Sequence, residues 1–283
     1  RDLNVGFSGG EKKKAEILIE IEKKRLKLGF PVYAYKYEII DYIQKNPICL
    51  ICGDTGIGKS IQIPQYILEE LPDLCKNQII GVIQSHQDVV KFKSEIILKE
   101  QTFLPDKNSH IAENQIEFIL DVELLQEYKK DPNLSMYGCL IIDEAHERTI
   151  TTDIILAVLI ELVLKRTKQF RVVIITDMMD ETFEKRFLSN IFRIPSFLYP
   201  ISIEYICAPI HTKYKLELLL PIIKEEHSKN LFLKKTHDEG NILVFLANLK
   251  EINFLSKKLK NLNDKSFSIV ELHENNFQDY QMQ

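Results

Sequence analysis

Eight consecutive residues have types and spacing suited to binding phosphate groups; they are Gly53, Asp54, Thr55, Gly56, Ile57, Gly58, Lys59 and Ser60. They fit the pattern G-x-x-x-x-G-K-[ST], and they follow a short apolar run that is typical of a buried strand. The glycines allow the backbone to turn with its N–H groups pointing inward, which forms a concavity of partial positive charge. Lys59 adds a full positive charge for the outer phosphates, and the Ser60 hydroxyl can be a ligand of Mg²⁺. We therefore expect a nucleotide site here, rather than a glycine-rich turn without a ligand.

A second group of chemically active side chains follows another apolar run, at Asp143, Glu144 and His146. In a parallel sheet, ligands bind at the edge formed by the carboxyl ends of the strands, so we expect both acids at that edge. Asp143 can hold Mg²⁺ directly or through a water molecule. Glu144 can position or deprotonate the water that attacks a terminal phosphate, and we expect His146 to hydrogen-bond across the site rather than to bind metal. Alone, this group could be an ordinary acidic loop, but its pairing with a phosphate loop favours a hydrolytic site.

The elements that must position these groups alternate between apolar strands and helices. We expect strands at residues 48–52, 79–83, 116–119, 139–142, 171–176, 203–207, 241–246 and 267–272. We expect helices at residues 11–27, 35–46, 59–70, 88–100, 121–130, 152–165, 181–189, 213–230 and 248–260. Near-continuous apolar strands separated by helices favour an α/β fold built on a doubly wound parallel sheet. We expect the strand tips that carry the phosphate loop and Asp143 to adjoin in this sheet.

The same pattern predicts four segments. Residues 1–30 are expected to form a lead-in and a charged helix, and residues 31–194 to complete one α/β domain. Residues 195–209 are proline-punctuated and irregular, which is typical of a linker, and residues 210–283 are expected to begin a second domain without completing it. Because the chain begins with Arg1 rather than Met, we expect it to be a fragment of a longer protein.

Composition excludes several classes of protein. With 45% hydrophobic and 28% charged residues the chain is expected to fold, and its net charge of −4 gives no global basic field for nucleic acid. Cys49-x-x-Cys52 could be a metal or redox pair, but no second pair follows at finger spacing, so two buried strand residues are favoured. Five cysteines used in this way fit an intracellular, reducing compartment, either nucleus or cytoplasm. No apolar run in the sequence is long enough to cross a membrane.

Taken together, these motifs resemble the DEAH-box family of ATP-dependent RNA helicases within superfamily 2. The family's G-E-T-G-S-G-K-S/T and Q-x-P-Q-Y appear as Gly53–Ser60 and Gln62–Tyr66, and its D-E-A-H-E-R-T appears as Asp143–Thr149. Its I-L-V-F-L is similar to Ile242–Leu246. The resemblance implies two RecA-like domains, the P-loop NTPase type of the doubly wound sheet, with ATP and Mg²⁺ bound to the first. It also implies an RNA partner, in single-stranded form, and leaves room for a protein activator.

The sequence departs from the family where the family grips nucleic acid. After the second strand the family carries Q-P-R-R, whereas this chain has Gln84-Ser85-His86-Gln87 without a positive charge. The family's S-A-T motif reads Thr176-Asp177-Met178 here, which keeps one hydroxyl and loses the other. Phosphate contacts depend on Lys and Arg, so we expect a weakened grip on RNA. Three lysines nearby, Lys91, Lys93 and Lys99, could compensate, but a solvated helix face is the favoured interpretation.

The resemblance therefore predicts an ATP-hydrolysing RNA helicase with two alternatives. The 283 residues hold no Gln-Arg-x-Gly-Arg-x-Gly-Arg motif, which in the family supplies an arginine finger worth about 10³–10⁵ in rate. We thus expect this chain to bind ATP and Mg²⁺ but to hydrolyse ATP slowly by itself. One alternative is a pseudo-helicase that binds ATP as a scaffold, and another is a superfamily 2 DNA helicase.

Overall fold

The computed structural model describes residues 9–76, 78–101, 116–166, 170–177, 191–195, 201–205, 212–233, 240–262 and 268–273. By their internal contacts, the residues form two compact units, Arg1–Tyr199 and Pro200–Gln283. The division between the units falls inside the segment that we expected to be a linker.

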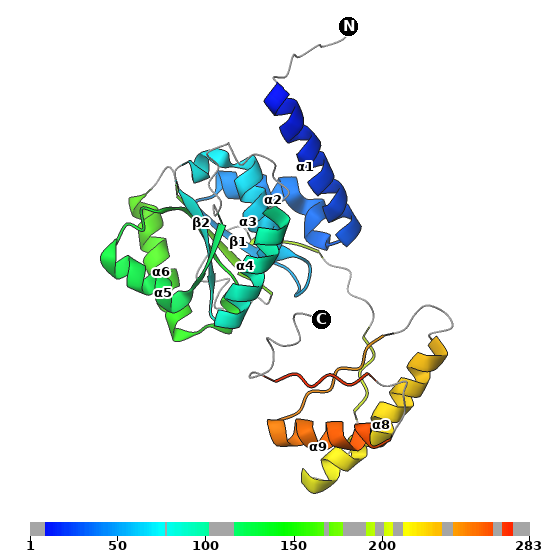
Figure 1. Ribbon diagram of the computed structural model, residues 1–283. Helices are drawn as coiled ribbons and strands as arrows, with labels where there is room; N and C mark the ends of the chain where they lie inside the picture. Colours follow the sequence, from blue (N-terminus) through cyan, green and yellow to red (C-terminus); the bar gives the residue numbers. More distant parts are fainter. Residues whose placement is uncertain are drawn as a thin grey trace. The chain divides into compact units, whose positions relative to one another are not determined.

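Unit 1 is built on a six-stranded parallel sheet (Figure 1). Its strands are β1 (Ile48–Cys52), β2 (Ile79–Gln84), β3 (Ile116–Leu120), β4 (Tyr137–Ile142), β5 (Arg171–Thr176) and β6 (Ile191–Arg193). Their order across the sheet is β3-β2-β4-β5-β1-β6. This arrangement confirms the predicted α/β fold with a doubly wound parallel sheet.

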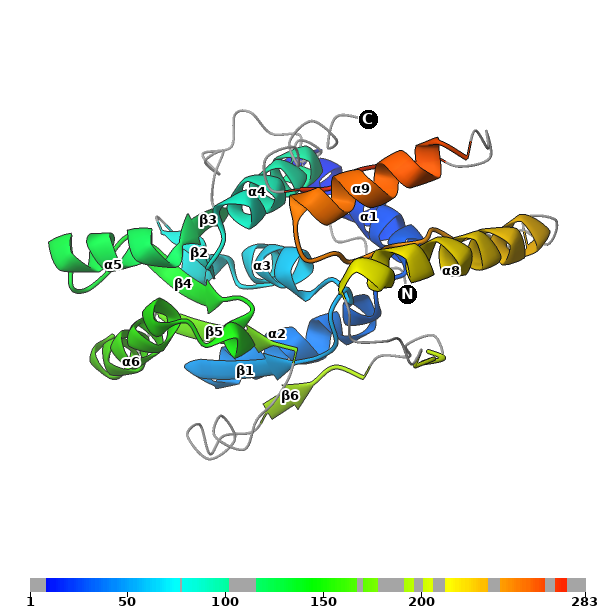
Figure 2. The same ribbon diagram turned by 90° about the horizontal axis from the view of Figure 1, so that it is seen from below.

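Helices cover both faces of the sheet. They are α2 (Lys36–Lys45), α3 (Lys59–Glu70), α4 (Gln87–Gln101), α5 (Asp121–Lys130) and α6 (Ile150–Lys165), with short 3₁₀ turns η1 (Pro31–Tyr35), η2 (Pro72–Cys75) and η3 (Ala145–Glu147). The first helix, α1 (Gly9–Leu28), extends away from the sheet (Figure 1). Successive strand residues alternate between two cores, because strand side chains point to opposite faces. Cys49 and Ile51 pack with residues of α2, α3 and α4, whereas Leu50 packs with residues of α5 and α6. These two sets of helices lie on opposite faces of the sheet (Figures 1 and 2).

The strand order corrects one expectation from the sequence. The tips of β1 and β4 do not adjoin, because β5 lies between them and pairs with both: Cys52 is opposite Thr176, and Ile142 is opposite Ile174. The chain crosses over after β1 to build β2, β3 and β4, and β5 then fills the remaining gap beside β1. The carboxyl end of β5, which carries Asp177, is thus the middle of three neighbouring strand tips.

A buried charge cluster attaches α1 to α3, the helix that follows the phosphate loop. The Arg25 guanidinium is 5% exposed and donates to Glu69 Oε1 (2.6 Å) and Gln65 Oε1 (2.7 Å). Lys36 Nζ, in α2, reaches Glu69 Oε2 at 3.0 Å, and both cations lie over the buried ring of Tyr66. Gln65 and Tyr66 of the Q-x-P-Q-Y motif therefore fix the helix on which Lys59 and Ser60 lie.

Unit 2 contains α8 (Thr212–Leu233) and α9 (Leu249–Lys260), which pack around Ile223, Leu255 and Leu259. The strands predicted at 203–207, 241–246 and 267–272 are wrong where the structure describes these residues, because no ladder of hydrogen bonds forms there. The side chains of residues 241–246 still alternate in burial: Val244 packs against the core of unit 2, whereas Phe245 is 87% exposed. The sequence therefore encodes the side-chain alternation of a strand, but backbone hydrogen bonding between strands also needs a neighbouring strand.

The helix predicted at 181–189 lies outside the described residues. Across the helices that can be examined, none combines the length and apolar character needed to cross a membrane.

Candidate active site

A pocket of about 280 Å³ lies in unit 1 where the carboxyl ends of β1, β4 and β5 meet. It is lined by Phe30, Thr55, Gly56, Gly58, Lys59, Ser60, Ile61, Lys93, Glu144 and Asp177. The two motifs that the sequence singled out therefore share one cavity, although their strands are not neighbours. Four of the lining residues were not predicted as site residues from the sequence: Phe30, Ile61, Lys93 and Asp177.

The phosphate loop runs from the end of β1 to the start of α3, and its glycines meet real conformational demands. Gly56 and Gly58 have φ angles of 83° and 94°, in the left-handed region that favours glycine. A Cβ at Gly58 would also lie 3.0 Å from Cγ of Phe30. Ile57 is 2% exposed and packs into the core, so only its backbone can face a ligand.

Lys59 is held by three acceptors. Its Nζ donates to the carbonyl oxygens of Gly53 (2.5 Å) and Asp54 (2.7 Å) and to Asp177 Oδ1 (2.8 Å). The side chains of Lys59 and Asp177 are 5% and 10% exposed. The Thr55 hydroxyl donates to the other carboxylate oxygen of Asp177. Burial raises the pKa of Asp177, but the hydrogen bonds from Lys59 and Thr55 outweigh it and leave the pKa below its usual value, so this carboxylate is ionised.

Asp143 is buried at the tip of β4 and also has a cation beside it. Its Oδ2 accepts hydrogen bonds from Lys93 Nζ (2.7 Å) and from Gln84 Nε2 (2.6 Å). The Asp143 side chain is 0% exposed and that of Lys93 is 14% exposed. Lys93 is therefore not on a solvated helix face, which corrects the interpretation favoured from the sequence. It neutralises the carboxylate that we expected to hold Mg²⁺.

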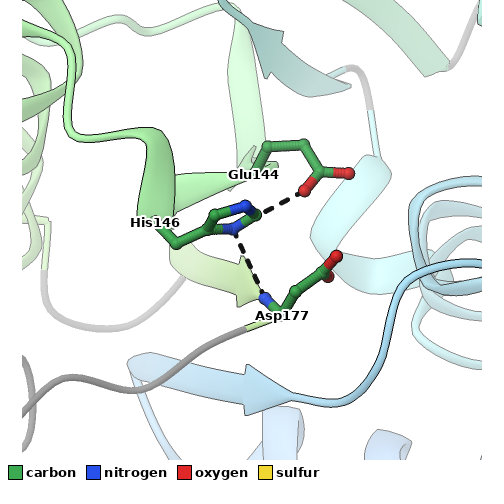
Figure 3. Close-up of side chains that lie close together, drawn as sticks. All are labelled: Glu144, His146 and Asp177. Carbon is green, nitrogen blue, oxygen red and sulfur yellow. Dashed lines mark hydrogen bonds and ion pairs between the residues drawn. The ribbon is translucent and has the colours of Figure 1, made fainter. Parts of the chain in front are cut away.

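Glu144, His146 and Asp177 form a compact cluster over the pocket (Figure 3). His146 Nδ1 lies 3.6 Å from Glu144 Oε2 and accepts a long hydrogen bond, 3.5 Å, from the backbone N–H of Asp177. Glu144 has a φ of 51°, a strained conformation for a residue with a side chain. Burial raises the pKa of Glu144, and the nearby charges of Asp143 and Asp177 raise it further.

The donor set suits a hard divalent cation such as Mg²⁺, which prefers oxygen ligands and keeps several waters. Ser60 and Glu144 line the pocket, and the Asp143 carboxylate already holds a positive group, the Lys93 ammonium. In addition, one oxygen or nitrogen atom from each of Glu144, His146 and Asp177 lies within 4.8 Å of the other two. Ser60 and Asp143 both offer the oxygen ligands that Mg²⁺ prefers, but Asp143 does not line the pocket and its carboxylate is paired with Lys93 and Gln84, so the metal site at these two residues stays a prediction.

We compared the chain with known proteins. No family model matches the sequence. The chain is 31% identical over 245 residues to "Pre-mRNA-splicing factor ATP-dependent RNA helicase prp22" of Schizosaccharomyces pombe, which covers 82% of this chain and 20% of that protein. It is 28% identical over 251 residues to "Probable ATP-dependent RNA helicase kurz" of Drosophila melanogaster, covering 85% and 21%. Over most of its length, the chain is similar to ATP-dependent RNA helicases of the DEAH-box type.

The chain thus spans about a fifth of the length of these two DEAH-box relatives. "ATP-dependent RNA helicase DEAH12, chloroplastic" of Arabidopsis thaliana is 27% identical over 253 residues, covering 85% of this chain and 14% of that protein. Among solved structures, the Escherichia coli DEAH/RHA helicase HrpB matches with a TM-score of 0.65 over 85% of this chain and 30% of that one. At 19% identity, the HrpB structure supports the fold alone.

The structure also describes the positions where this chain departs from the DEAH-box pattern. Gln84 contacts Asp143, while the Ser85 hydroxyl and the His86 ring both contact Glu147. These side chains thus contact the DEAH segment, in a stretch where the family carries arginines. Met178 lies outside the described residues. Asp177 could have been predicted as a site residue, because it follows an apolar strand just as Asp143 does.

Proposed function

We propose that this chain is the ATP-binding part of a DEAH-box RNA helicase, which hydrolyses ATP to ADP and phosphate and uses the reaction to move along single-stranded RNA. The observation that carries the proposal is the shared pocket: Lys59 and Ser60 from the phosphate loop and Glu144 from the DEAH segment line one cavity. A nucleotide site needs these groups to converge on one triphosphate.

The phosphates would bind to the loop of residues 53–60. Gly56 and Gly58 expose backbone at the wall of the pocket, and α3 begins there, so its amino-terminal end favours an anion. Lys59 would neutralise the outer phosphates, once its ammonium turns from Asp177 to the ligand. Asp54, Thr55 and Ile57 complete the loop, the last through its backbone.

Ser60 and Asp143 would hold Mg²⁺, which supplies charge neutralisation between the outer phosphates. Glu144 would accept the proton of the attacking water, a role that suits a half-buried carboxyl with a raised pKa. His146 would connect the state of the nucleotide to the rest of the protein, because its ring contacts both Glu144 and the backbone of Asp177.

RNA is proposed as the partner, with a weakened grip on unit 1. The stretch from Ser85 to Gln87 carries no Lys or Arg, and two of its side chains contact Glu147 instead of being free for a phosphate. The same observation favours the alternative of an ATP-binding scaffold that does not unwind RNA. A protein activator could supply what this lobe lacks, including a transition-state arginine.

An ATPase assay on the protein that contains this chain, with and without single-stranded RNA, tests the proposal. Stimulation by RNA, with a strand-displacement activity that needs ATP, is expected for a helicase. ATP hydrolysis that RNA leaves unchanged would favour the scaffold, and stimulation by DNA alone would favour a DNA helicase. Hydrolysis that survives Lys59→Ala would contradict the site itself.

A further inference from the structure

The pocket already contains an anion bound to the ammonium that a nucleotide needs. Asp177 accepts hydrogen bonds from Lys59 and from Thr55, and these donors belong to the phosphate loop. A carboxylate with two oxygens toward the loop occupies the electrostatic place of a phosphate group.

We propose that Asp177 is an internal competitor of the nucleotide: its carboxylate holds Lys59 in the empty site, and the phosphate chain must displace it in order to bind. The inference rests on the proposed function, because it takes Lys59 as the phosphate-binding lysine. It goes further by assigning to Asp177 the control of nucleotide affinity.

Burial makes this competition strong. The side chains of Lys59 and Asp177 are 5% and 10% exposed, so little water screens their attraction. Removing the carboxylate leaves a buried ammonium without its charged partner, a state that is costly for a protein. A bound phosphate relieves that cost, whereas in the native chain the phosphate only replaces one anion with another. The Asp177 carboxylate therefore stabilises the empty site and lowers the net free energy gained when a nucleotide binds, compared with a chain that lacks this carboxylate.

Displacement of Asp177 would also affect His146 and Glu144, which lie outside the phosphate loop. The backbone N–H of Asp177 donates to His146 Nδ1, and the cluster includes Glu144 (Figure 3). Because a carboxylate oxygen of Asp177 and a ring nitrogen of His146 lie within 4.8 Å of each other, a movement of the carboxylate away from Lys59 changes the charge beside the His146 ring. Through this link the arrival of phosphate reaches the DEAH segment, although β1 and β4 are separated by β5.

The test is a titration of the full 283-residue chain with a fluorescently labelled ATP, since the chain has no Trp to report binding. Asp177→Asn keeps the shape of the side chain and removes its charge. We expect it to bind ATP at least about tenfold more tightly than the native chain, which corresponds to about 1.4 kcal/mol. Asp177→Glu restores the charge and should bind closer to the native affinity. The matched control is Asp73→Asn, which removes the same charge from an exposed position and should leave affinity unchanged.

Tripolyphosphate, which has the phosphate chain but no nucleoside, gives a second measurement. It should raise the melting temperature of Asp177→Asn more than that of the native chain, even if the variant is less stable alone. Unchanged or weaker ATP binding by Asp177→Asn, with native binding that Lys59→Ala removes, would overturn this inference and leave the proposed function in place. If the native chain and every variant fail to bind ATP, the proposed function fails as well.

Discussion

Replacing Lys93 by Met should make the stability of unit 1 depend on Mg²⁺. The Lys93 ammonium lies 2.7 Å from a carboxylate whose side chain, that of Asp143, is 0% exposed. Removing one partner of a buried ion pair costs about 3–5 kcal/mol. We take the lower end, about 3 kcal/mol, because Gln84 still donates to the same oxygen of Asp143. For a unit of this size each kcal/mol lowers the melting temperature by about 2–4 °C, which gives a decrease of roughly 6–12 °C.

Mg²⁺ without nucleotide should reverse much of this loss. If Asp143 is a Mg²⁺ ligand, the cation takes the place that Lys93 leaves, and at 100 times its dissociation constant it restores about 2.7 kcal/mol. Differential scanning calorimetry with increasing MgCl₂ measures both effects. Lys91→Met, an exposed lysine on the same helix, is the matched control and should respond like the native chain. If Mg²⁺ stabilises Lys93→Met no more than it stabilises the control, Asp143 is not a cation site.

Three further outcomes follow from the same geometry. Glu144→Gln should retain ATP and lower turnover by about 10²–10⁴-fold, the usual contribution of a general base; full turnover would place that role elsewhere. The pKa of Glu144 is raised by burial and by the charges of Asp143 and Asp177. Because a protonated Glu144 cannot accept a proton from water, the hydrolysis rate should fall as the pH decreases through the pKa of Glu144. Asp177→Asn removes one of these charges, so the pH at which the rate falls should become lower. If that pH does not change, Glu144 is not the group whose protonation lowers the rate. Gly138→Ala should lower the free energy of unfolding of unit 1 by about 1–3 kcal/mol, because a Cβ at this position would overlap with the carbonyl oxygen of Leu74. A urea titration measures this change, and Gly240→Ala, where a Cβ meets open space, is the control.

Local patterns were sufficient to predict much of unit 1. The run Ile48–Cys52 and the loop after it form a strand and a glycine turn, because both depend on side-chain burial and on φ angles that neighbouring residues fix. The order of the strands could not be read in this way. The position of β5 between β4 and β1 depends on contacts between distant segments, so the expectation that the tips of β1 and β4 adjoin is wrong. The short strand β6 was missed because its three residues show no alternation; its Phe192 packs against Tyr42, 5.6 Å between ring centroids.

The same limit applies to the site. Lys59, Ser60 and Glu144 were predicted from motifs, and the structure places all three at one pocket. Lys93 was interpreted as part of a solvated helix face, because the charge pattern of a helix does not say which lysine faces an acid from another element. Asp177 was noted only as a departure from the family motif. Its pairing with Lys59 joins residues 118 apart in the sequence, and such a contact appears only once the sheet is assembled.

The central claim is that Lys59 belongs to a phosphate site, and ATP titration of Lys59→Ala tests it most directly. The variant loses the ammonium and also leaves the Asp177 carboxylate facing the phosphates without a cation. We expect its affinity for ATP to fall at least about 100-fold, or about 2.7 kcal/mol, relative to the native chain, while alanine at the exposed Lys76 changes nothing. An ATP affinity of Lys59→Ala equal to that of the native chain would contradict the account.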